Sequence, residues 1–234
     1  MDNYYDSPIG RAHRLRQLFC NANSLCLCIT EVMDYLTEVY GVQFSTYEQI
    51  ASDLNISVFR VENNIAHSSD AASQYLIDDG ILSIIYKDNT LPERKVWSLA
   101  HEIGHIMCGH FGKHNLLSYG QMEIEANIFA RELIAPSPLV MHYVVSNRGD
   151  NRIPITDCYF AYRNIFGMSK QAAFNSSQYL SKNFKDIPIN PNLITDYTSA
   201  FNNTLKFVKS FSDYDYLVKS TIPEFRSQER YYAI

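Results

Sequence analysis

The sequence predicts an α+β fold that is mainly helical with a small β-sheet. Apolar residues recur at three- and four-residue spacing over most of the chain, which is the pattern of amphipathic helices. Short runs typical of strands are identified between residues 56 and 86. The 234 residues, 46% hydrophobic and 19% charged, are enough to bury a core and are ordinary for a globular protein.

The N-terminal part is expected to be helical before it reaches the sheet. Apolar spacing predicts helices within residues 9–40, and Gly41 is a plausible end. Ser45 and Glu48 have the spacing of a capping box for a short helix that reaches Leu54. Strands are then predicted at residues 56–62, 75–78 and 81–86.

Two helices follow the predicted sheet. Thr90 is a candidate N-cap, Pro92 suits a first turn where a missing N–H costs little, and Glu93 completes the cap. This helix is expected to reach about Gly109 or Phe111. A second helix is predicted from about residue 119 to 134, ended by the prolines at 136 and 138.

The first of these helices carries His101-Glu102-x-x-His105. At about 100° per residue the two histidines lie on one face a single turn apart, where both rings can bind one zinc ion. Glu102 projects beside that face, so its carboxylate can take a proton from an attacking water. The complete motif on a capped helix favours a metal site over two unrelated histidines.

A catalytic zinc site needs a third protein ligand. A histidine ten residues after His101 would supply it in one known pattern, but Phe111 occupies that position. The second helix offers Glu123 and Glu125, which flank its apolar stripe on opposite sides. Helical geometry alone does not choose between these two carboxylates.

The segments SLAHEIGHIMCGH and EIEANIFARELIAP together resemble the ImmA/IrrE family of metallo-endopeptidases, over roughly residues 30–140. The resemblance implies a zincin-like core in which His101, His105 and Glu125 bind zinc and Glu102 is the general base. Glu123 remains the alternative third ligand. The second helix ends in Leu-Ile-Ala-Pro where the family usually has Leu-Leu-Met-Pro, a change that roughly keeps the shape.

The sequence pattern predicts the domain organisation, and the resemblance implies the substrate. Residues 1–148 would form the metallopeptidase domain with its N-terminal helical region, and residues 149–234 a C-terminal helical region. The implied function is zinc-dependent cleavage of a regulatory protein, such as a helix-turn-helix repressor of a phage or mobile element. The alternative is a zinc-binding regulator or sensor in transcriptional control that does not cleave.

Direct nucleic-acid binding is not expected. The formal charge is −5 and the isoelectric point about 5.8, which is unlike a broadly basic surface. Residues 159–173 resemble a helix-turn-helix, but their second helix offers few basic side chains for phosphates. Packing or partner recognition is the favoured role of that segment.

The cysteines and the N-terminus suggest a cytoplasmic protein. Five cysteines without a pairing pattern are typical of reduced thiols, and Cys108, close to His105, is interpreted as a packing residue. The first residues do not have the order of a secretory signal, and apolar runs are too short to span a membrane.

Four side chains could assist an oxyanion, and the sequence does not choose among them: Tyr119, His110, His114 and Tyr143.

Overall fold

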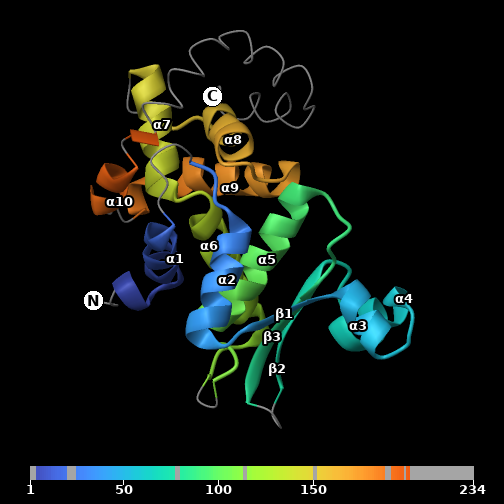
Figure 1. The fold of residues 1–234 in the computed structure, drawn as a ribbon. Coiled ribbons are helices and arrows are strands. Elements are labelled where there is room, and N and C mark those ends of the chain that lie inside the picture. The colour runs from blue at the N-terminus through green and yellow to red at the C-terminus, as the bar shows by residue number, and fades with distance from the viewer. Residues whose placement is uncertain are drawn as a thin grey trace. The chain divides into compact units, whose positions relative to one another are not determined.

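The computed structural model describes residues 4–19, 25–76, 80–112, 115–149, 152–187, 191–197 and 199–200 (Figure 1). These residues belong to two compact units. The first falls within Met1–Phe19 and Leu27–Pro136, and the second within Cys20–Cys26 and Ser137–Ile234. The division lies at Pro136, upstream of the expected boundary at residue 148.

The first unit is built from helices around a three-stranded sheet, which confirms the predicted fold class. In the sheet, β1 (Gln43–Thr46) pairs in parallel with β3 (Ile81–Tyr86), and β2 (Ala71–Leu76) pairs antiparallel with the other side of β3. The strand β2 is therefore at an edge. The helices are α1 (Pro8–Leu18), α2 (Ile29–Tyr40), α3 (Tyr47–Asp53), α4 (Val58–Arg60), α5 (Pro92–Met107) and α6 (Tyr119–Ile134).

Both faces of the central strand β3 are covered. Ile84 and Ile85 are both buried and, as neighbours in a strand, they point to opposite faces. Ile85 packs in one cluster with Tyr47 and Ala51 of α3 and with Val61. The helix α5 contacts β2 and β3, so the sheet supports the helix that carries the two motif histidines.

The strand predicted at residues 56–62 is wrong. Ser57 caps α4 by accepting a hydrogen bond from the Arg60 N–H, and a π-helical turn continues over Val61–Ala66. Val61 and Ala66 are the buried positions of this segment. Their spacing suits a helical turn against α3, and this packing outweighs the β-branched composition.

The short strand β1 was not predicted, and the caps near it differ in detail. Thr46, not Ser45, caps α3 in a capping box with Gln49. At α5 the cap position is Leu91, without a side-chain hydrogen bond, and Pro92 is the first helical residue. The predicted bounds of α6 are confirmed, with Ser118 and Gln121 forming its capping box.

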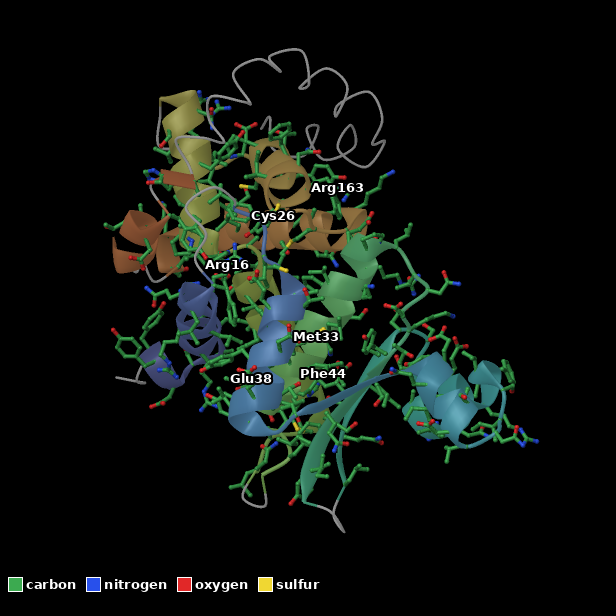
Figure 2. The ribbon with its side chains drawn as sticks, viewed as in Figure 1. Arg16, Cys26, Met33, Glu38, Phe44 and Arg163 are labelled. Atoms are coloured by element: carbon green, nitrogen blue, oxygen red, sulfur yellow. The ribbon has the colours of Figure 1, made fainter. Side chains whose placement is uncertain are left out.

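The second unit is helical where it is described. It contains α7 (Ser137–Arg148), α8 (Ile155–Phe160) with a π-helical turn over Ala161–Ile165, α9 (Lys170–Asn183) and α10 (Pro191–Asp196). The Cys26 thiol donates a hydrogen bond to the Ile165 carbonyl at 3.3 Å; Cys26 is labelled in Figure 2. Apolar spacing in the sequence also favours a helix over residues 194–211, most of which lies outside the described residues. Among the described helices, none has the length and apolarity to cross a membrane.

The helix-turn-helix-like segment forms in this unit as two packed helices. Gly167 adopts a positive φ of 74° in the turn, and Ser169 caps α9 by accepting from the Ala172 N–H. The buried residues of α9, Ala172, Ala173 and Leu180 among them, indicate that this helix is a packing element of its unit.

Candidate metal centre

The two motif histidines lie side by side on α5. Leu99 and Ile103, on the opposite face of the helix, are buried and anchor it in the core. The Nε2 atoms of His101 and His105 are 3.2 Å apart, and their side chains are 17% and 12% exposed. The histidines therefore sit at the border between core and solvent, with their Nε2 atoms converging on one point.

Gly104 lets α6 approach α5 closely. A Cβ atom at position 104 would lie 3.1 Å from both the Cα and the carbonyl oxygen of Ala126, and 3.3 Å from Phe129 Cβ. Such contacts are tighter than side chains normally make. The glycine therefore admits the neighbouring helix, and the close approach sets which residues of α6 face the histidines.

Glu123 completes the cluster with the two histidines. Its Oε2 lies 3.3 Å from His101 Nε2, and its Oε1 lies 3.3 Å from His105 Nε2. Donor atoms about 2.0–2.1 Å from one zinc ion at tetrahedral angles lie about 3.3–3.4 Å from one another. The three side chains have the chemistry and the spacing of a three-ligand zinc site.

Glu125 takes a different place from the one expected. Residues 123 and 125 are about 200° apart around a helix, so they point to different flanks of α6. Glu125 Oε2 lies 3.1 Å from His110 Nε2, and together with Cys108 these two residues form a second group of potential ligands. The structure thus brings the alternative, Glu123, to His101 and His105.

The end of α5 explains the position of His110. Gly109 has a positive φ of 76°, its N–H donates to the Ile106 carbonyl, and the His110 N–H donates to the His105 carbonyl. These are the two hydrogen bonds of a Schellman motif, which folds the residue after the glycine back over the last helical turn. His110 Nδ1 consequently lies 2.9 Å from His105 Nδ1. Gly109 was the sequence signal for this contact.

Burial and the neighbouring ring keep His105 neutral. Removal from water lowers the pKa of His105 to about 4, with His101 acting in the same direction and Glu123 opposing it. A neutral imidazole has the free lone pair that metal binding requires.

Glu102 is held by the edge strand of the sheet. Its Oε2 accepts hydrogen bonds from the Ser73 backbone N–H at 2.7 Å and from Ser73 Oγ at 2.5 Å. Sequence reasoning did not identify Ser73, because the contact joins residues 29 positions apart and depends on how β2 lies against α5. The two bonds fix the carboxylate beside the histidine pair.

One cleft of about 770 Å³ is lined by the two motif histidines, Glu102, Glu123 and Ser73. Tyr119 lines it and is hydrogen-bonded to Glu123, whose charge raises the pKa of that tyrosine. His110 also lines it, but is engaged with His105 and Glu125. Of the other expected oxyanion donors, Tyr143 belongs to the second unit and His114 lies outside the described residues. The walls come from β2, α5, α6 and the segment Ala66–Asp70.

Comparison with known proteins identifies the family. A family model described as the IrrE N-terminal-like domain, of the M78 peptidases, matches residues 51–173, which is more than half of the chain. The chain belongs to the M78 peptidase family. No curated protein and no solved structure gives a significant match.

The matched region of this M78 peptidase contains the whole cluster and both helices that build it. Membership in the family makes the chain a metallopeptidase and implies a metal ion, and the His101, His105 and Glu123 group offers a donor set that fits one. The predicted resemblance to ImmA/IrrE proteins is confirmed.

Proposed function

We propose that this M78 peptidase is a zinc-dependent endopeptidase whose ion is held by His101, His105 and Glu123. The observation that carries the proposal is the convergence of two imidazole nitrogens and one carboxylate at zinc-ligand spacing. With three protein ligands a fourth position stays open for water or substrate, as catalytic zinc sites require. A bound zinc ion would lower the pKa of water and polarise the peptide carbonyl.

Glu102 is the proposed general base. Both hydrogen bonds from Ser73 reach Oε2, so Oε1 is the atom assigned to proton transfer. Oε1 takes a proton as the water oxygen attacks the carbonyl carbon, and passes it to the amide nitrogen as the C–N bond breaks. Ser73 keeps the carboxylate in one orientation throughout, so little reorganisation is needed during the reaction.

The proposed substrate is a regulatory protein, with a helix-turn-helix repressor of a phage or mobile element as the first candidate. The open cleft supports a polypeptide substrate, because a chain segment can lie along β2 and reach Glu102. Cys28, Cys108 and Cys158 are free thiols, which suits action in the reducing cytoplasm.

The test is co-expression with repressors encoded beside the gene. The wild-type protein should cleave one of them, and Glu102→Gln should abolish cleavage while zinc content stays at one ion per chain. Glu38→Gln, on the exposed surface of α2, is the matched control and should cleave normally (Figure 2). If the partner is bound and released intact by the zinc-loaded wild type, the protein is a zinc-binding regulator without proteolysis.

A further inference from the structure

A chain of three side chains leads away from the proposed ion. His105 Nδ1 lies 2.9 Å from His110 Nδ1, and His110 Nε2 lies 3.1 Å from Glu125 Oε2. The chain joins the end of α5 to α6 on the flank opposite Glu123. It starts on the ring nitrogen of His105 that does not face His101 and Glu123.

The proton positions in this chain follow from the hydrogen-bond inventory of imidazole. His105 offers Nε2 to the cluster, so in a neutral ring Nδ1 carries the hydrogen and donates. His110 Nδ1 must then accept, which leaves the hydrogen of His110 on Nε2, where Glu125 accepts it. Each step has one donor and one acceptor, so a single arrangement satisfies the whole chain.

We propose that His110 and Glu125 are positioning residues that orient His105 and strengthen its binding of zinc. The inference rests on the proposed function, since it requires an ion at His101, His105 and Glu123. Metal-bound histidines are generally fixed by a partner on the second ring nitrogen, and such a partner makes the ligand more basic. Here the partner is a second histidine, itself fixed by a carboxylate.

Burial and backbone geometry support this role. The His110 side chain is 2% exposed, so its ring nitrogens depend on protein partners. The Schellman turn fixes its backbone, and Asn115 Nδ2 donates to its carbonyl at 2.9 Å. The backbone of His110 is therefore fixed, and its ring is held between His105 and Glu125, as an orienting group must be.

The nearby thiol of Cys108 could make the same region a second metal site. However, His110 Nε2 and Glu125 Oε2, 3.1 Å apart, satisfy each other without an ion. We therefore assign the pair to positioning, and metal stoichiometry distinguishes the two roles.

The experiment measures zinc affinity in the full chain by competition with a chromophoric chelator at one fixed pH. His110→Phe keeps a ring but removes both nitrogens, and Glu125→Leu removes the acceptor. Each should weaken zinc binding about 10–100-fold. The double variant should bind no more weakly than His110→Phe alone, because both changes break one chain. Glu125→Gln retains an acceptor oxygen and should restore most of the affinity lost in Glu125→Leu.

Cobalt substitution gives a readout that a general loss of stability would not move. The visible absorption bands of the Co(II) protein should shift in His110→Phe and in Glu125→Leu, because the orientation of His105 changes. Cys108→Ser and Glu38→Gln are controls, expected to keep the wild-type affinity and spectrum.

The outcomes separate this inference from the proposed function. If the wild type binds no zinc, or His101→Gln binds it equally tightly, the proposed function fails. If the wild type binds zinc and both His110→Phe and Glu125→Leu match it, only the positioning role is overturned. Binding of two zinc ions, one of which is lost in Cys108→Ser, also overturns it in favour of a second metal site.

Discussion

The helix α6 carries a glutamate near each end, and each glutamate contacts a histidine of another segment in different surroundings. Near its start, Glu125 accepts from His110 at 3.1 Å, and the Glu125 side chain is 32% exposed. Near its end, Glu132 lies 3.0 Å from His13 of α1, and both side chains are almost fully buried. Tyr4 and Arg131 extend the buried pair, with Tyr4 at 2.6 Å from the other His13 nitrogen.

The difference shows that surroundings, rather than residue types, assign the role of a Glu–His pair. The buried pair joins α1 to α6 inside the core, where removing one partner leaves the other charged or polar groups without compensation. At the cleft the Glu125 carboxylate is partly exposed, although His110 is buried, so the loss of Glu125 should cost little folding energy but should change the orientation of His105, the proposed ligand. One end of α6 serves stability and the other serves the site.

The largest expected effect is on the buried pair. Glu132→Ala should lower the free energy of unfolding by about 3–5 kcal/mol, because His13 and Arg131 lose a carboxylate in a dry environment. Urea denaturation of the metal-free protein measures this. Glu38→Ala, at an exposed position of α2, should stay within about 0.5 kcal/mol of wild type. A loss below about 1 kcal/mol for Glu132→Ala would contradict the structural role.

The next largest effect is on zinc affinity, and it distinguishes Glu123 from Glu125. Glu123→Ala should weaken zinc binding by more than about 100-fold, since a ligand contributes more than the outer groups, whose loss costs 10–100-fold. Glu125→Ala should fall within that smaller range. Isothermal titration or chelator competition measures both. If Glu125→Ala is the more damaging change, Glu125 is the third ligand, as the sequence resemblance implied.

A smaller effect is expected where α5 and α6 touch. Gly104→Ala should cost about 1–3 kcal/mol of stability, because its Cβ would press on the backbone of Ala126. Zinc affinity should fall with it, as Glu123 moves away from the histidines. Gly120→Ala is the matched control on α6. Its Cβ meets nothing within 4 Å, so it should be neutral or stabilising by up to about 1 kcal/mol. Equal results for the two variants would refute the close-contact argument.

The smallest expected effect is that of removing Glu125 on the stability of the metal-free protein. Glu125→Ala should change the free energy of unfolding of the metal-free protein by less than about 1 kcal/mol, because a partly exposed carboxylate contributes little to stability. In excess zinc the difference from wild type should grow by about 1.4 kcal/mol for each tenfold loss of affinity. Paired denaturation curves with and without zinc test this. A large loss without zinc would make this pair structural too.

Local signals in the sequence were sufficient to predict the two helices that carry the candidate metal ligands. The His101 and His105 spacing, and the prolines beyond residue 134, act within one or two turns, so α5 and α6 could be predicted. The fold class followed from the same periodicity. The strand prediction at residues 56–62 was wrong because the β-branched residues there belong to a helical turn packed on α3.

The parts that the sequence left open depend on contacts between distant elements. The choice of Glu123 over Glu125 near the histidines depends on the rotation of α6, which the Gly104 and Ala126 contact fixes. The hydrogen bonds from Ser73 to Glu102 depend on where β2 lies against α5. No periodicity within one segment encodes either, whereas Gly109, followed by His110, was a local signal that could have been used.

The most direct test of the central claim is anomalous scattering at the zinc edge from crystals of the zinc-loaded protein. If His101, His105 and Glu123 hold the ion, one strong peak should lie about 2 Å from His101 Nε2, His105 Nε2 and a Glu123 carboxylate oxygen. A peak coordinated by Glu125, a peak between Cys108 and His110, or no peak near the two α5 histidines would contradict it.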